Sequence, residues 1–188
     1  MGRWAPDARG RLAKAAMELY AEQGFEQTTA LEISERAGVT ERTFFRYFAD
    51  KREVLFQGSE MLEQAILESI RMAPDSLRPI DIVIAAMEGV GTVFLDRAHS
   101  IRRAQIIAAN PALRERELMK MASISTAVAE ALRQRGVAEP GATLAAETGV
   151  TVFKVGFESW IAGTPSDDWV ECIHATVDQL RDVTPSSG

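Results

Sequence analysis

Apolar residues recur at intervals of three and four along most of this chain, the spacing of helices that bury one face. After residue 50 this pattern predicts helices over Lys51 to about Met72, Ile80 to about Asp96, Ile101 to Ala109, Pro111 to about Gln134, Ala142 to Ala162, and about Asp167 to Asp182. β-branched residues between Thr148 and Phe157 favour a strand, but their helical period favours a helix. The pattern as a whole predicts an all-α fold of about nine helices.

Before residue 51, two short helices joined by a tight turn are predicted from local capping signals. Thr29 can cap a helix that begins at Ala30, and Glu32 completes a capping box. Gly38 can adopt positive φ and end that helix, and Thr40 can cap a second helix from Glu41. Two helices around such a turn form a helix-turn-helix, which we expect within a three-helix N-terminal domain.

The second of these helices has one apolar face and one polar face. At 100° per residue, Phe44 and Phe48 share the face that we expect to be buried. Arg42, Thr43 and Arg46 point away from that face and are the candidates for reading DNA bases. Arg42 is the first choice, because Arg can donate two hydrogen bonds to guanine O6 and N7.

The neighbouring residues are candidates for contacts with the DNA backbone. Phe45 and Tyr47 lie on the flanks of the helix, where a ring can pack on sugar or phosphate and a hydroxyl can donate to a phosphate oxygen. Hydroxyls or amides at helix starts and one charge would add further phosphate contacts, from Thr28, Thr29, Thr40 and Lys51.

These residues carry a resemblance to the TetR family of bacterial transcriptional regulators. The matching positions run from Ala15, Met17, Glu18, Leu19 and Tyr20 through Gly24, Phe25, Thr28, Thr29, Ile33, Ala37, Gly38 and Val39 to Phe48 and Lys51. The resemblance covers roughly the first third of the chain. It implies that the helix from Thr40 is the recognition helix and that Lys51 touches phosphate.

The chain departs from the commonest family pattern at three positions. Phe45 replaces a frequent Tyr, so a hydroxyl for the DNA backbone is missing there, and Tyr47 replaces a frequent His. Arg42 stands where a small residue is frequent, which suggests a distinct operator. The resemblance also implies that the last two helices form a homodimer and that the middle helices enclose a small-molecule effector.

Net charge and cysteine content limit the partners and the compartment. The formal charge of −6 argues against a nucleic-acid binder, but residues 1–56 hold nine basic and nine acidic residues, so the excess lies entirely in residues 57–188. Cys172 is the only cysteine, which excludes an intramolecular disulfide and fits the cytoplasm. No apolar run approaches the roughly 20 residues of a membrane span. Residues 1–10 are expected to form a short mobile arm, in which Arg3 and Arg9 could reach a minor groove, although a plain disordered tail fits them better.

Candidate ligand and dimer residues come from the remaining helices. Met side chains adapt to irregular ligands, so an apolar pocket is expected around Met87, Phe94, Met119 and Met121. Aromatic and apolar residues of the last two helices are the candidates for a two-fold interface: Phe153, Phe157, Trp160, Trp169 and Ile173. Both sets also fit an ordinary core. Arg102 and Arg103 could bind an acidic effector, although a solvated face fits them better.

Catalytic chemistry is not indicated by any spacing in the sequence. Cys172 and His174 lie two residues apart on a predicted helix and therefore point about 200° apart, which disfavours a shared metal or catalytic pair. We expect no catalytic residue, metal or cofactor. The leading hypothesis is an effector-released DNA-binding repressor, with residues 1–50 as arm and DNA-binding domain and residues 51–188 as effector-binding and dimerisation domain. The alternative is a helical small-molecule or partner-binding protein that no longer reads DNA.

Overall fold

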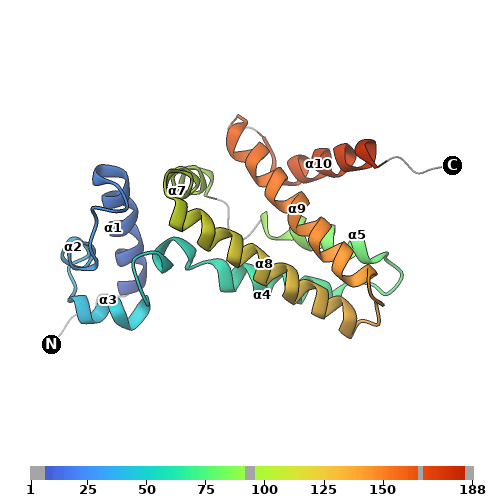
Figure 1. Ribbon diagram of the computed structural model, residues 1–188, viewed down its shortest axis with the longest axis horizontal. Helices are drawn as coiled ribbons and strands as arrows, with labels where there is room; N and C mark the ends of the chain where they lie inside the picture. The colour runs from blue at the N-terminus through green and yellow to red at the C-terminus, as the bar shows by residue number, and fades with distance from the viewer. Residues whose placement is uncertain (1–6, 92–95, 165–166, 185–188) are drawn as a thin grey trace. The chain divides into compact units, whose positions relative to one another are not determined.

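The computed structural model describes residues 7–91, 96–164 and 167–184 and is all-α over these ranges (Figure 1). The fold class predicted from periodicity is confirmed. The described residues form nine α-helices and one 3-10 helix: α1 (Ala8–Gln23), α2 (Ala30–Arg36), α3 (Glu41–Tyr47), η1 (Glu53–Phe56), α4 (Ser59–Met72), α5 (Pro79–Gly89), α7 (Arg97–Ala109), α8 (Pro111–Gln134), α9 (Gly141–Ala162) and α10 (Trp169–Val183).

The chain divides into two compact units. Unit 1 comprises Met1–Gly58 and Ala98–Glu117, and unit 2 comprises Ser59–Arg97 and Leu118–Gly188. Unit 1 therefore contains α1 to α3, η1, nearly all of α7 and the start of α8. Ile107 of α7 and Leu113 of α8 are fully buried in the same core as Leu12, Ile33 and Phe44, which explains why these later segments belong to this unit.

Unit 2 is built around α9, which packs against both α5 and α10 (Figure 1). Small residues on α9 permit a close approach of the neighbouring helices. A methyl group added at Gly149 would lie 2.1 Å from Val83 Cγ1 of α5, and one at Gly156 would lie 2.7 Å from Ile173 Cδ1 of α10. Glycine is therefore required at position 149 for this helix packing.

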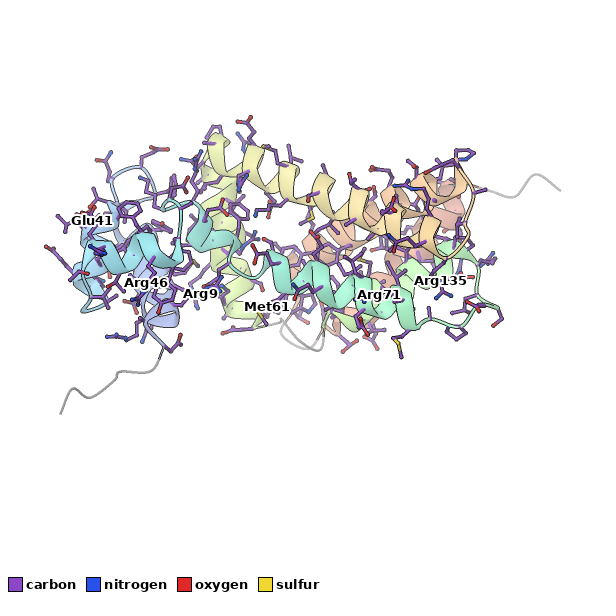
Figure 2. All side chains as sticks on the ribbon, turned by 90° about the horizontal axis from the view of Figure 1, so that it is seen from below. Arg9, Glu41, Arg46, Met61, Arg71 and Arg135 are labelled. Atoms are coloured by element: carbon purple, nitrogen blue, oxygen red, sulfur yellow. The ribbon has the colours of Figure 1, made fainter. Side chains whose placement is uncertain are left out.

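Arginine side chains close two helix ends in unit 2. Arg135 donates to the carbonyls of Arg71 and Ala73 at the end of α4 and pairs with Asp75, and Figure 2 shows Arg71 and Arg135 beside each other. Arg97 donates from Nε to the Trp160 carbonyl at 3.1 Å, at the end of α9. The last carbonyls of a helix have no partner within the helix, so these contacts satisfy them.

One predicted helix start and the predicted extent of the N-terminal arm differ from the structure. The helix expected from Lys51 is interrupted, because η1 ends at Phe56 and α4 begins only at Ser59. Asp50 explains the short first piece, since its Oδ1 accepts hydrogen bonds from the amides of Arg52 and Glu53. Residues 8–10, predicted as part of a mobile arm, are helical, since α1 begins at Ala8 and contains Arg9, while Arg3 lies outside the described residues.

Most other helix predictions are close to the observed bounds. The segment from Thr148 to Phe157, where a strand competed, lies wholly within α9. The helix predicted to end near Asp96 ends at Gly89 as α5, and residues 92–95 lie outside the described residues.

Candidate nucleic-acid interface

The helix-turn-helix of unit 1 is formed by α2, a short turn and α3, with the predicted caps in place. The Thr29 hydroxyl accepts from the Glu32 amide while the Glu32 carboxylate accepts from the Thr29 amide, which completes the capping box. This bonding also holds the pKa of Glu32 below its ordinary value. Gly38 has a φ of 66°, and the Thr40 hydroxyl accepts from the Thr43 amide to cap α3. The local signals of the sequence therefore set the angle between the two helices.

The turn is held from α1 by an arginine that the sequence did not single out. Arg11 Nη1 donates to the Ala37 carbonyl at 2.9 Å, and this contact satisfies a carbonyl at the end of α2. The same Nη1 atom would lie 3.7 Å from a methyl group at Gly38. Arg11 therefore links α1 to the position where α3 is launched.

The two faces of α3 are those that the period predicted. Phe44 is fully buried and Phe48 is 3% exposed, while their rings lie 5.6 Å apart. Arg42, Phe45, Arg46 and Tyr47 are exposed, and Thr43 is half-buried. Figure 2 shows Glu41 and Arg46 on this helix. Arg42, Arg46 and Tyr47 therefore expose two basic groups and one hydroxyl on this face of α3.

Arg46 and Tyr47 are paired on this exposed surface. Arg46 Nη2 donates to the Tyr47 hydroxyl at 3.0 Å, and the guanidinium carbon lies 4.8 Å from the centre of the Tyr47 ring. Phe45 is more than half exposed and its ring meets Phe44 edge to face at 5.3 Å. Position 45 therefore offers no hydroxyl, while the hydroxyl at position 47 is already bonded to Arg46.

Lys51 does not have the free ammonium that a phosphate contact needs, so this prediction requires correction. Its Nζ donates to the carbonyls of Phe25, Glu26 and Thr28 at 2.8, 3.1 and 2.8 Å. It also lies 4.4 Å from the centre of the Phe25 ring. An ammonium has three protons, so these bonds use all of its donors to hold the loop between α1 and α2.

The Thr28 hydroxyl is also unavailable to phosphate, against the prediction. Thr28 is only 1% exposed, and its hydroxyl donates to the Gly24 carbonyl at 2.8 Å. Thr29 and Thr40 are exposed, but their hydroxyls are used in caps. Both hydroxyls accept a hydrogen bond in a cap, so a phosphate could use only their remaining hydrogen-bonding capacity. The Thr40 hydroxyl also lies 3.0 Å from that of Thr43.

Several other basic residues of unit 1 are neutralised by carboxylates. Arg36 forms two hydrogen bonds with Glu22, and Arg52 pairs with Asp50 at 2.6 Å. These bonds hold the pKa of Glu22 and of Asp50 below their ordinary values. The carboxylates stay ionised at neutral pH, so Arg36 and Arg52 contribute little net positive charge to a DNA-facing surface.

Arg103 is not on a solvated face, which corrects the sequence interpretation. Its Nε donates to the Leu55 carbonyl at 2.8 Å, and its guanidinium pairs with Glu117 at 3.0 Å. Burial lowers the pKa of this guanidinium from its ordinary value. Asn110 similarly donates to Glu26 at 2.6 Å. These long-range partners have no signal in sequence spacing, whereas Arg102 is exposed as expected.

The predicted ligand residues do not share one environment. Met87 is 1% exposed within the core of unit 2, and Met121 is half-buried against that core. Met119 is 58% exposed, and Phe94 lies outside the described residues. A cavity of about 250 Å³ lies in unit 1 instead, lined by Tyr20, Gln23, Gly24, Phe25, Glu26, Gln27, Ile106, Ala109 and Asn110. Met87 and Met119 therefore do not lie together on one lining.

Three of the five predicted dimer residues are buried inside a single chain, which leaves them little surface for a second one. Trp160 and Trp169 are 4% and 5% exposed, and Ile173 is fully buried. Trp169 donates from Nε1 to the Met87 carbonyl at 3.0 Å. Phe153 and Phe157 are half-buried and stacked at 6.3 Å, so they retain some surface.

The described residues meet the requirements of neither a metal site nor a membrane span. Within the described ranges, no group of three or more His, Cys, Asp and Glu side chains could hold a metal ion. None of the described helices is long and apolar enough to cross a membrane.

Two protein-family profiles match most of the chain. One, described as bacterial regulatory proteins of the tetR family, matches residues 12–57, which include α2 and α3. The other, described as the MftR C-terminal domain, matches residues 77–185. The second match alone covers more than half of the 188 residues.

Two relatives are named as HTH-type transcriptional regulators. The HTH-type transcriptional regulator TcmR of Streptomyces glaucescens is 35% identical over 82 residues, which are 44% of this chain and 36% of TcmR. The HTH-type transcriptional regulator CymR of Pseudomonas putida is 33% identical over 114 residues, 59% of this chain and 56% of CymR. The chain thus spans between about a third and somewhat over half of the length of these two relatives.

Solved structures match over almost the whole chain. FadR of Thermus thermophilus, a transcriptional repressor in complex with lauroyl-CoA, is 25% identical with a TM-score of 0.55, over 96% of this chain and 99% of that one. SmeT of Stenotrophomonas maltophilia in complex with triclosan is 18% identical with a TM-score of 0.65, over 94% and 90%. The likeness to SmeT concerns the fold alone.

Proposed function

Because this chain belongs to the TetR family of transcriptional regulators and carries an MftR-type C-terminal domain, we propose that it represses transcription by binding an inverted-repeat operator as a homodimer. The family comprises regulators and not enzymes. The observation that carries the proposal is the capped helix-turn-helix, in which α3 turns Arg42, Arg46 and Tyr47 to solvent and buries Phe44 and Phe48. The proposed compartment is the cytoplasm, where bacterial DNA lies.

DNA binding is assigned to unit 1. The second helix of a helix-turn-helix lies in the major groove, and the residues near its N-terminus contact base edges. Arg42 is the second residue of α3 and is exposed, so it is the proposed base reader, with Thr43 beside it. Arg46, one turn further along α3, is the other base-reading candidate, and Thr29, Thr40, Phe45 and Tyr47 are proposed to face the backbone.

A homodimer is assigned to the last two helices, on surface that the single chain leaves open. α9 buries Ala146, Gly149 and Trp160 against its own unit. On other sides of α9, Leu144 is 61% exposed and Val155 is 37% exposed. Exposed apolar side chains on one helix suit a two-fold contact with the same helix of a second chain. Two recognition helices about 34 Å apart would then read successive major-groove faces.

Release by a small molecule is assigned to unit 2. FadR of Thermus thermophilus was solved with lauroyl-CoA and SmeT with triclosan, and both share this fold. We propose an apolar effector for this chain as well, with half-buried Met121 as the candidate contact on α8, since Met adapts to irregular shapes. Such a ligand releases DNA only if it binds the DNA-bound and free arrangements with different affinity.

The experiment that tests this function selects bound duplexes from a random-sequence DNA library with the purified protein at two salt concentrations. An inverted repeat whose enrichment persists at the higher salt is the expected result, because base contacts survive when phosphate contacts are screened. Weak binding without sequence preference that disappears with salt would contradict it. The selected operator then serves to screen apolar small molecules for release of the DNA.

A further inference from the structure

We propose that Arg46 and Tyr47 form one preorganised site for a phosphate of the DNA backbone, so that Arg46 positions the protein and does not read bases. This inference rests on the proposed function. It divides the exposed residues of α3 into a base-reading part around Arg42 and a backbone-binding part around the pair.

The pair is already assembled without DNA. Arg46 Nη2 donates to the Tyr47 hydroxyl at 3.0 Å, while the guanidinium carbon lies 4.8 Å from the centre of the Tyr47 ring. A hydrogen bond and a cation–π contact from the same two side chains fix the guanidinium along the ring. An isolated exposed arginine would have to lose more rotamer freedom on binding, so the pairing lowers the entropic cost.

The donors left over suit a phosphate. A guanidinium carries five N–H groups, and this contact uses one of them. The Tyr47 oxygen accepts from Arg46, which leaves its own proton free to donate. The pair can thus offer several N–H donors and one O–H donor to neighbouring oxygens of one anion, and charge-assisted bonds of this kind are strong.

Position on the helix favours a backbone phosphate over a base edge. α3 runs from Glu41 to Tyr47, so Arg46 and Tyr47 are its last two residues. In a helix-turn-helix the N-terminal residues of the recognition helix reach the base edges. Arg42 lies one turn nearer that end. A guanidinium held over the neighbouring ring is also less free to extend into the groove.

The test is a double-mutant cycle on the selected operator. Arg46→Gln, Tyr47→Phe and the double variant are titrated with the operator at several salt concentrations, and each variant also repeats the library selection. Arg46→Gln is expected to weaken binding about tenfold for each half-site and to lower the slope of log affinity against log salt by about 0.9 for each half-site, or about 1.8 for the dimer on the full inverted repeat. Tyr47→Phe keeps the ring and removes only the hydroxyl.

The cycle separates a coupled phosphate site from two independent contacts. If the residues act together, the double variant binds nearly as well as Arg46→Gln alone, because the first substitution already removes the joint site. All three variants should select the same inverted repeat as the unaltered protein. Arg102→Gln is the matched control. Arg102 is exposed in unit 1 on α7, so its substitution removes the same charge from a helix other than α3.

Two results would overturn the phosphate site, and a third would overturn the proposed function. Fully additive losses would show that the two residues do not form one site. A changed base at any operator position with Arg46→Gln would make Arg46 a base reader. Failure of the unaltered protein to select any duplex would instead overturn the proposed function. Circular dichroism of each variant verifies that the helices are retained.

Discussion

The ammonium of Lys51 donates its three protons to backbone carbonyls of the loop between α1 and α2. The backbone of Lys51 is in turn tied to α1, because the Tyr20 hydroxyl donates to the Lys51 carbonyl at 2.6 Å. Burial raises the pKa of that tyrosine above its ordinary value, so the hydroxyl keeps its proton. Lys51 therefore holds the loop that leads into the Thr29 cap of α2.

Replacing Lys51 by Met is expected to reduce the stability of unit 1 without removing a phosphate contact. Hydrogen bonds to a charged group contribute about 1.5 to 3 kcal/mol each, and partial exposure limits the sum, so a loss of about 2 to 3 kcal/mol is expected. Urea unfolding followed by circular dichroism measures it. The slope of DNA affinity against salt should stay that of the unaltered protein.

Lys14→Met supplies the control for that experiment. The Lys14 side chain is 81% exposed and pairs only loosely with Glu18, at 3.9 Å. Its replacement should change the stability by less than about 0.5 kcal/mol. A Lys51→Met protein that is as stable as the unaltered one, with a salt slope lower by one phosphate contact, would restore the direct role.

Arg42 is expected to carry sequence preference. Arg42→Ala should cost about 1 to 3 kcal/mol of binding to the selected operator and relax the preference at one base pair in each half-site. Titration of the operator and of single-base variants measures both effects. Binding of every duplex as tightly and as selectively as before would show that another residue reads the base.

Local signals explain which elements the sequence predicts well. Thr29 with Glu32 and Thr40 with Thr43 each act within a few residues, so α2 and α3 begin where the caps require. The helical period of α9 likewise needs only its own residues. The partners of Lys51, Arg103 and Trp169 are 14 to 82 residues away in the chain, so no spacing rule could identify their roles.

The sequence also could not show whether an apolar helix face is buried within one chain or between two chains. Trp160, Trp169 and Ile173 have the periodicity of any helix that buries an apolar face, and that face is covered by the helices of unit 2 itself. Periodicity shows that a face is buried but does not show by what. For the same reason the sequence could not decide whether Met87 lines a pocket or belongs to the core, although such a residue is more often core.

At the scale of elements, the packing of α9 on α5 depends on the absence of a side chain at Gly149. Gly149→Ala is expected to destabilise the protein by about 1 to 3 kcal/mol, because its methyl group would overlap fully buried Val83. Thermal or urea unfolding measures the change. Gly89→Ala is the matched control, since Gly89 is an exposed helical residue with no atom within 4 Å of an added methyl group.

The control should move in the opposite direction. Alanine favours a helix over glycine by up to about 1 kcal/mol, so Gly89→Ala is expected to leave stability equal or higher. Equal destabilisation by both substitutions would mean that the loss at Gly149 reflects something other than overlap with Val83.

At the scale of the whole molecule, charge and valency have to be considered together. Residues 1–56 are formally neutral, and the chain as a whole carries −6. Long-range attraction to DNA is therefore weak, and the affinity of a single unit 1 for a half-site should be low and sensitive to salt. Two linked units gain from the second contact being intramolecular, so the proposed sequence-specific repression requires the proposed homodimer.

That dependence can be tested at Val155, which is 37% exposed on α9 beside the exposed Thr151. Val155→Glu places a charge in the proposed contact between two copies of α9, where the desolvated carboxylates would repel each other. Sedimentation velocity should show a shift from dimer to monomer. Affinity for the full inverted repeat should fall strongly while affinity for a single half-site stays unchanged, because unit 1 is not altered.

Met72→Glu distinguishes this effect from a general response to an added surface charge. Met72 ends α4 and is 76% exposed, so its replacement adds the same charge outside the proposed contact and should leave both the dimer and operator binding intact. A Val155→Glu protein that still sediments as a dimer would move the interface away from this side of α9. Half-buried Phe153 and Phe157 would then be the next positions to substitute, since they retain surface on the same helix.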